Sequence, residues 1–137
     1  MKQRPRSRYT LRGEVQGTRQ LVIDDGMFTN GFRIVWMEVW HVNRDNGAEV
    51  ILHNSSAPPI RPTTADGGQM AWSFYFPAGV DRGLTSRTVV DPDHIINQDM
   101  FITSLDGQKV CYIILLEPYE MTEDEGVLQL IKNNNQV

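Results

Sequence analysis

Three histidines are the residues of this chain most able to do chemistry, because an imidazole nitrogen can bind a metal ion or act as a general base. They are His41, His53 and His94. His41 and His53 each end an expected strand, so a hairpin could bring their rings together at one end of a barrel. Such a metal site also needs a further ligand close by. The clustered spacing of histidines on one strand is absent, so we expect hydrogen-bonded or surface histidines and no metal ion.

Other candidate motifs have simpler explanations. The segment "DPDHIINQD" offers oxygen ligands of the kind that calcium takes, but Asp-Pro-Asp is also ordinary turn chemistry. Cys111 lies inside the apolar run "VCYIILL", which predicts a buried and inert thiol. The chain has neither a G-x-S-x-G motif nor a phosphate-binding loop. The sequence therefore predicts a protein that is not an enzyme and has no cofactor.

The start of the chain carries a basic stripe. Its cations are Lys2, Arg4, Arg6, Arg8 and Arg12. A proline within this stripe excludes the interior of a helix, and alternate residues of an extended segment share one side. The stripe could neutralise phosphates with weak, salt-sensitive affinity, or it could lie on a neighbouring copy. A solvated tail is the alternative, and the net charge of −4 argues against a dedicated nucleic-acid binder.

The strands that would position these residues are marked by alternating apolar side chains and by turn residues such as Asn-Gly and Asp-Gly. Without helical periods between them, such strands predict an all-β fold: an eight-stranded antiparallel sandwich, jelly-roll-like, with one short C-terminal helix. An immunoglobulin-like sandwich is the alternative, although its Cys–Trp–Cys framework is absent. The expected strands are residues 8–15, 19–23, 31–42, 48–53, 69–76, 84–90, 98–104 and 109–117.

Length and composition fit one globular domain. The chain has 137 residues, of which 40% are hydrophobic and 22% charged. No apolar run approaches the about 18 residues of a membrane-spanning helix, so no membrane association is expected. The basic start is not followed by an apolar stretch, so we expect no secretory signal. The expected organisation is a basic extended arm at 1–12, a β-sandwich domain at 13–121, and a C-terminal helix and tail at 122–137.

The C-terminal helix is predicted from its capping residues. Thr122 is a good N-cap, and Glu125 follows at the spacing of a capping box. The helix would carry an apolar stripe at three- and four-residue spacing, formed by Val127, Leu128 and Ile131. A second departure from the strand pattern is the segment 54–68, a long loop rich in Pro, Ser and Thr. Loops of this length in compact domains are usually functional or flexible.

The run "FRIVWMEVW" at 32–40 would be apolar on both faces of its strand. Simple alternation places Phe32, Ile34, Trp36, Glu38 and Trp40 on one face and the residues between them on the other. Exposed apolar patches of several hundred Å² usually mark contact sites, so we expect a neighbouring copy to cover part of this strand, with Glu38 near the rim. The predicted subunit interface comprises Trp36, Met37, Trp40, Val127, Leu128 and Ile131.

Four segments carry a resemblance to known proteins: "RQLVIDDGMFTNGFRIVWMEVW", "QMAWSFYF", "DPDHIINQDMFITS" and "YIILLEPYEMTEDEGVLQLIKNNNQ". In these the chain resembles small β-rich structural proteins of viruses, especially single-domain capsid or head-decoration proteins of bacteriophage-like particles. The resemblance implies a basic arm, a compact sandwich and self-assembly into a shell, with no catalytic residues. The arm is shorter than the resemblance would lead us to expect.

The first functional hypothesis is therefore a viral structural protein. It would self-assemble through apolar strand faces and charged terminal segments into a capsid or virion shell. It would form a homo-oligomer of many copies in the virion, assembled in the host cytoplasm. The alternative is a monomeric β-sandwich that binds a ligand such as a carbohydrate, with Trp36, Trp40, Trp72 and Tyr75 as stacking platforms. A third hypothesis, a cupin-like enzyme, requires about one metal ion per chain in the purified protein.

Overall fold

The computed structural model is all-β and describes residues 8–22, 30–77, 86–96 and 100–120, together with residues 127, 128 and 131. Within these ranges nine strands form two antiparallel sheets. The four-stranded sheet has the order β1 (Tyr9–Gln16), β9 (Lys109–Glu120), β3 (Asn30–His41) and β7 (Ile95–Ile96). The five-stranded sheet has the order β2 (Thr18–Leu21), β8 (Met100–Ser104), β4 (Ala48–His53), β5 (Gln69–Tyr75) and β6 (Ser86–Val90).

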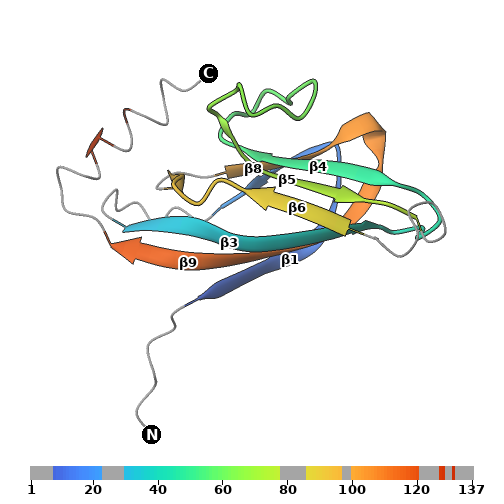
Figure 1. Cartoon of the computed structure of the whole chain (residues 1–137), viewed down its shortest axis with the longest axis horizontal. Coiled ribbons are helices and arrows are strands. Elements are labelled where there is room, and N and C mark those ends of the chain that lie inside the picture. The colour runs from blue at the N-terminus through green and yellow to red at the C-terminus, as the bar shows by residue number, and fades with distance from the viewer. Residues whose placement is uncertain are drawn as a thin grey trace, which may run out of the picture.

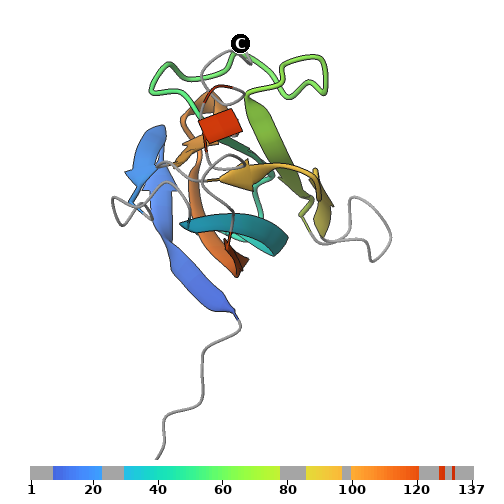
Figure 2. The ribbon, with the colours of Figure 1, turned by 90° about the vertical axis from the view of Figure 1, so that its left-hand side faces the viewer.

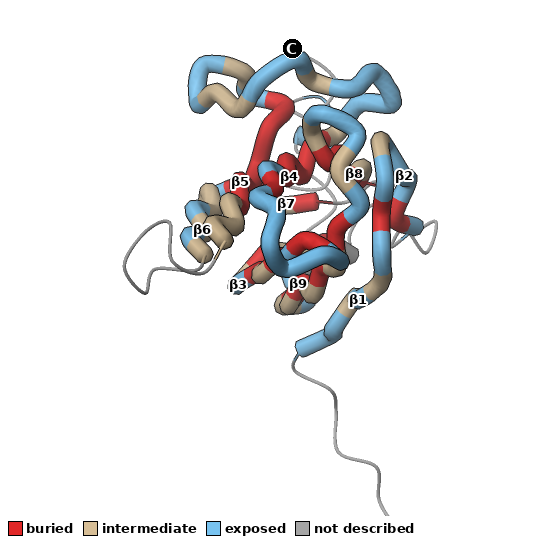
Figure 3. Tube along the Cα trace, turned by 90° about the vertical axis from the view of Figure 1, so that its right-hand side faces the viewer, coloured by how far each residue is buried: buried red, intermediate tan, exposed pale blue. Residues whose placement is uncertain are grey.

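The two sheets lie in two layers (Figure 1), and Figure 2 shows the layers from the side. The core between them is apolar and fully buried, and Figure 3 shows the buried segments gathered where the sheets face each other. Its largest completely buried members on β3 and β9 are Met37, Ile114 and Leu116, and the nearly buried Tyr112 of β9 packs with them. The five-stranded sheet contributes Leu52, Met70, Met100 and Ile102. Burial of these side chains is the main favourable term in the stability of the fold.

The eight predicted strands are confirmed, each with ends within three residues of the observed ones where both ends are described. The ninth strand, β7, was missed because two residues are too few to show a periodicity. The predicted C-terminal helix falls mostly outside the described residues. Val127, Leu128 and Ile131 are helical and exposed. Among the described residues, no helix is long and apolar enough to cross a membrane.

A β-bulge in β3 corrects the predicted faces of that strand. Ile34 pairs with Leu116 of β9 and Trp36 pairs with the next residue, Leu115, so Val35 is an extra residue without a partner. A bulge of one residue reverses the alternation beyond it. Ile34 therefore points into the core, whereas Trp36, Glu38 and Trp40 point outward. The prediction that these residues share a face with Ile34 is wrong.

The chain passes from one sheet to the other between β1 and β2. Gly17 occupies this corner with a φ of +79°, in the left-handed region that favours glycine. Its carbonyl accepts a hydrogen bond of 2.8 Å from the backbone N–H of Ser104, at the end of β8. The return from β8 to β9 runs through a short 3-10 turn at Leu105–Gly107. These two corners therefore hold the sheets together at the same end of the fold.

Candidate assembly surfaces

The outer face of the four-stranded sheet carries most of the predicted interface residues. In an antiparallel pair, residues directly opposite each other point to the same side of the sheet. The register of β1, β9 and β3 therefore builds three rows across this face: Thr10, Leu115 and Trp36; Arg12, Ile113 and Glu38; and Glu14, Cys111 and Trp40. We call these nine residues the outer face.

The outer face has apolar side chains that are open to solvent, while Arg12 and Glu38 flank Ile113 in its middle row. Trp36 is 42% exposed and Trp40 is 39% exposed, so each indole has surface that a partner could cover. Ile113 and Leu115 are partly exposed between β1 and β3. Met37, which was predicted in the same interface, is fully buried between the sheets and contributes to the core. Met37 follows Trp36 directly in the strand, so ordinary alternation turns it to the opposite face, and the bulge decides that this face is the core.

Charged pairs lie at the two ends of the outer face. Arg33 and Glu117 form an ion pair of 3.1 Å between β3 and β9 at one end. Lys109 and Glu14 form a longer pair of 3.7 Å between β9 and β1 at the other end. Both pairs are exposed, so each contributes at most about 1 kcal/mol to stability. An apolar centre with a polar rim is the usual anatomy of a protein–protein interface.

Glu38 lies on the side of the outer face nearest to β6. Its Oε1 accepts a hydrogen bond of 3.1 Å from the hydroxyl of Ser86, the first residue of β6. The predicted position of Glu38 at a rim agrees with this contact. The same edge holds an open pocket of about 350 Å³, lined by Glu38, Trp40, Arg44, Tyr75 and Ser86 together with Val39.

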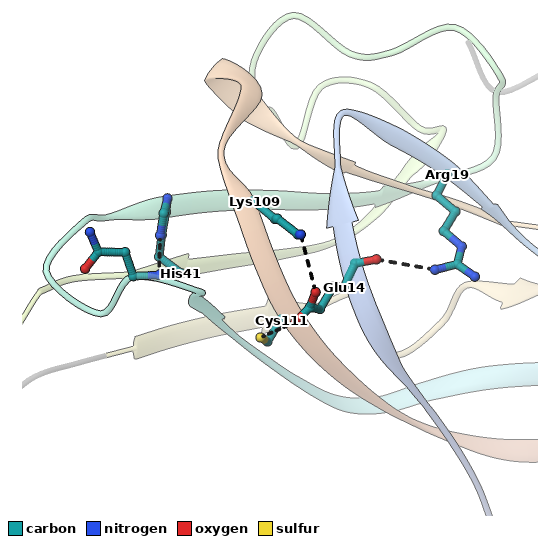
Figure 4. A network of polar contacts seen from close by, with 6 residues as sticks. Glu14, Arg19, His41, Lys109 and Cys111 are labelled. Carbon is teal, nitrogen blue, oxygen red and sulfur yellow. Dashed lines mark hydrogen bonds and ion pairs between the residues drawn. The ribbon is translucent and has the colours of Figure 1, made fainter.

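Cys111 differs from its predicted state, because it is only partly buried and points outward. Figure 4 shows it on β9 beside Glu14 of β1, and its Sγ lies 3.8 Å from a Glu14 carboxylate oxygen. Burial and the negative charge of Glu14 raise the pKa of the thiol. A thiol with a raised pKa is protonated at neutral pH and is a poor nucleophile, so the prediction of an inert cysteine still agrees with its surroundings.

The histidines do not meet. His41 ends β3 next to the connection that leads to β4 in the other sheet, whereas His53 lies at the far end of β4, about five residues and roughly 17 Å along that strand. The backbone N–H of Asn43 donates to His41 Nδ1 at 2.8 Å, so Nε2 carries the proton and donates to Gln108 Oε1 at 2.7 Å. β3 and β4 lie in different sheets, so the hairpin that could have brought the two rings together does not form.

His53 has a structural environment. Its Nε2 lies 2.6 Å from the hydroxyl of Thr103, and its ring stacks on Phe101 at 5.9 Å. Burial lowers the pKa of His53 to about 4, while the backbone of Ser55 and the charge of Asp66 act in the opposite direction. His53 is therefore neutral at physiological pH. Within the described ranges, no three His, Cys, Asp or Glu side chains are grouped so that they could hold a metal ion.

The predicted basic stripe is described only in part. Residues 1–7, and with them Lys2, Arg4 and Arg6, lie outside the described residues. Arg8 is exposed just before β1, and Arg12 is exposed within β1 as a member of the outer face. The segment "DPDH" forms a turn, in which Asp91 Oδ1 accepts from the backbone N–H of Asp93 at 3.0 Å.

Sequence reasoning missed Ile113 and Leu115 as members of the outer face. The run "VCYIILL" is apolar at every position, so its periodicity does not say which residues face outward. The pairing of β9 with β3 supplies that information. Comparison with protein-family models, with curated proteins and with solved structures finds no match to this chain. The strand pairing and the outer face are therefore the features from which a function can be inferred.

Proposed function

We propose that this chain is a jelly-roll subunit that self-assembles into a virion shell, and the strand pairing is the observation that carries the proposal. A jelly roll winds eight strands as a nested set of antiparallel pairs, first with last and so on inward. Here β1 pairs with β9, β2 with β8, β3 with β7, and β4 with β5. The remaining strand, β6, extends the five-stranded sheet beyond β5.

The outer face supports assembly as the role of this fold. Jelly rolls serve as capsid subunits, lectins and cupins, so the site must decide among them. A cupin needs a metal-binding cluster, and among the described residues His41 and His53 are held apart and no three possible ligands are grouped. A shell subunit needs an apolar surface that a neighbour can cover. Trp36 and Trp40 on β3, with Leu115 and Ile113 beside them on β9 and charged pairs at the ends of the face, provide such a surface.

The termini have proposed roles in the same assembly. The basic arm would contact nucleic acid weakly inside the particle or lie on a neighbouring copy, through Lys2, Arg4, Arg6, Arg8 and Arg12. The apolar stripe of the C-terminal helix would pack on a second subunit, and its three members are exposed. The proposed location is the virion, formed in the host cytoplasm, and bacteriophage-like particles are the proposed setting.

The direct experiment measures the mass of the purified full chain at high micromolar concentration by light scattering after size exclusion, with electron micrographs of the same sample. The proposal expects large homo-oligomers or particles. Replacing Trp36→Lys and Trp40→Lys together should dissolve them, because the two charges would have to be buried in the contact. The matched control is Val42→Lys, which changes an exposed apolar residue just beyond β3. A wild-type chain that stays monomeric at this concentration contradicts the proposal.

One observation favours a second candidate, carbohydrate binding. The pocket of about 350 Å³ beside Trp40 combines an indole with a carboxylate, a guanidinium and two hydroxyl groups. Sugars are bound by this combination of an aromatic face and hydrogen-bonding groups. Trp72 does not fit the role that was predicted for it, because it is nearly buried. A glycan array distinguishes the candidates: a monomer that binds a sugar, and loses it in Trp40→Ala, favours this one.

A further inference from the structure

β1 is the longest edge strand in the part of the chain that the structure describes. It has eight residues, whereas the other edge strands, β7, β2 and β6, have two, four and five. Figure 3 shows β1 at the border of the fold. Natural sheets blunt their edges with short strands, prolines or bulges, because a long regular edge pairs with other chains. β1 contains no proline and pairs with β9 without a bulge, so its other edge is suited to a further strand.

The hydrogen bonds of β9 show which backbone groups of β1 are turned to this free edge. The N–H of Val42 donates to the carbonyl of Lys109 at 3.1 Å, so the backbone groups of Lys109 are turned to β3. Backbone groups alternate in direction along a strand, so those of Val110 are turned to β1, where Val110 pairs with Val15. The odd-numbered residues of β1 therefore bond to β9. The residues whose N–H and carbonyl groups are turned to the free edge are Thr10, Arg12, Glu14 and Gln16.

A contact from β2 agrees with this direction. Nη1 of Arg19 donates to the carbonyl of Glu14 at 3.3 Å, and Figure 4 shows the guanidinium reaching this atom. The carbonyl is therefore open to donors other than β9. The bond is long and Arg19 is exposed, so the N–H of an incoming strand can replace the guanidinium.

Charge selects one register for two copies of β1 that pair antiparallel about a two-fold axis along nearly the whole strand. With the axis between Arg12 and Gly13, outward residues would lie opposite inward ones, so this register is excluded. With the axis at Arg12, two guanidinium groups would lie directly opposite each other, which is destabilising. With the axis at Gly13, Arg12 of each copy lies opposite Glu14 of the other. Within the described ranges Arg12 forms no ion pair of its own.

The register centred on Gly13 also suits the remaining positions. It places Leu11 opposite the partner's Val15 on the core side of the sheet. The residues turned to the free edge lie opposite one another, so about eight backbone hydrogen bonds would join the two strands. At the axis two glycines meet. The ring of Tyr112 already occupies the space beside each glycine, since a Cβ at Gly13 would lie 2.8 Å from the Tyr112 hydroxyl.

We propose that a second copy of this chain is the partner of the free edge, and that two copies pair through β1 in the register centred on Gly13. A second copy is the occupant because β1 carries its own charge complement at the spacing that this axis requires. The contact is isologous, and its affinity comes from main-chain hydrogen bonds while the charge pairs fix the register. The two four-stranded sheets become one continuous sheet, and the two outer faces become one surface. The contact rests on the proposed assembly for its purpose, but its geometry does not depend on that proposal.

The first test is sedimentation equilibrium of the full chain in the Trp36→Lys and Trp40→Lys background, which removes contacts through the tryptophans. We expect a monomer–dimer equilibrium. Glu14→Arg should weaken the dimer by about tenfold or more, because two attractive cross-strand pairs become repulsive at once. Glu49→Arg is the matched control, since Glu49 is an exposed glutamate of the five-stranded sheet, and it should leave the equilibrium unchanged. A background protein that stays monomeric at high micromolar concentration, or a dimer indifferent to Glu14→Arg, overturns the proposal.

Mixing two charge variants separates a lost contact from a misfolded protein. Copies with Arg12→Glu and copies with Glu14→Arg should each dimerise poorly alone. Mixed in equal amounts they should form a heterodimer, because two glutamates of one copy then lie opposite two arginines of the other. A mixture with no more dimer than the separate variants overturns the charge pairing.

Disulfide trapping tests the register. With Cys111→Ser added to the same background, copies with Arg12→Cys are mixed with copies with Glu14→Cys and oxidised. The proposal expects a mixed disulfide, because the Cα atoms of opposite residues would lie about 5.5 Å apart. Arg12→Cys copies alone should form no disulfide above background. A strong disulfide in those copies alone would place the axis at Arg12 and overturn the register.

The contact and the shell fail separately. Wild-type particles together with a monomeric background protein overturn this contact and preserve the shell, whereas a dimer without particles preserves this contact and refutes the shell. If the cysteine of Glu14→Cys is instead captured only by another protein, that protein occupies the edge and the self-contact is overturned.

Discussion

Replacing Gln69 by leucine should destabilise the fold and release the loop between β4 and β5, residues 54–68. The amide of Gln69 is the only described side chain that joins Arg61, Thr63 and Trp72, through three hydrogen bonds of 2.7 to 3.0 Å. Leucine has nearly the same length but neither donates nor accepts. The buried indole N–H and two loop groups would therefore lose their partner without a large change of volume.

The magnitude follows from the number and burial of these bonds. A typical hydrogen bond contributes about 1 kcal/mol net, and a buried donor left without a partner costs about 1 to 3 kcal/mol. We expect Gln69→Leu to lower the free energy of unfolding by about 3 kcal/mol, because the loop groups can regain water whereas the N–H of Trp72 cannot. With a urea slope of about 1 to 3 kcal/mol per molar, the midpoint should fall by about 1 M or more.

The assay is urea unfolding followed by tryptophan fluorescence, combined with hydrogen exchange of the backbone amides in the loop. Gln16→Leu is the matched control, because Gln16 is exposed and makes one bond of 3.1 Å to the carbonyl of Gly107. The control should change the free energy of unfolding by less than about 0.5 kcal/mol. If Gln69→Leu behaves like the control and the amide of Thr63 keeps its protection, the loop is held by other contacts and the reasoning fails.

Three further predictions follow from the geometry. The pKa of His53 is about 4 in the folded chain and 6.5 in the unfolded chain, so the free energy of unfolding should be highest above pH 6.5 and should fall by about 3 kcal/mol as the pH falls from 6.5 to 4. Urea midpoints measured across this pH range should fall less in His53→Gln than in the wild type. Parallel curves for the two proteins would contradict this prediction. Gly13→Ala should destabilise the fold, because its new Cβ would lie 2.8 Å from the hydroxyl of Tyr112. Adding Tyr112→Phe removes that hydroxyl and should recover part of the lost melting temperature. A double variant that melts below Gly13→Ala would refute this account. Glu14→Gln should speed the alkylation of Cys111 at neutral pH, since the carboxylate raises the pKa of the thiol; an unchanged rate would show that burial alone controls it.

The strands were predictable because each is a short apolar or alternating run between strong turn residues. Residues 48–53 were predicted to the residue, and the Asp-Gly step at 106–107 lies in the connection from β8 to β9. The pairing was not predictable, because periodicity does not say which strand is a neighbour. The role of Gln69 was hidden for the same reason: its partners become neighbours only when the loop folds back on β5.

The faces of β3 show most clearly where sequence reasoning ended. Alternation of side chains assumes an unbroken ladder, and one unpaired residue at Val35 reverses every position after it. No composition signal marks this bulge, since the residues on either side of Val35, from Ile34 to Met37, are all apolar. Met37 was predicted at the interface and is found in the core, whereas Trp36 and Trp40 are exposed and their place in a subunit contact stays a prediction.

The bulge also bears on what the outer face is for. Without the extra residue, Trp36 and Trp40 would continue the inward face of Ile34 and add two large aromatic rings to the core. Folding alone would favour that arrangement, because burying such a ring stabilises the native state. The chain instead presents both rings to solvent while Met37 and Val39 fill the core. In the proposed assembly a neighbouring copy would cover this surface, so the bulge would turn a strand that could have served the core into one that contacts a neighbour.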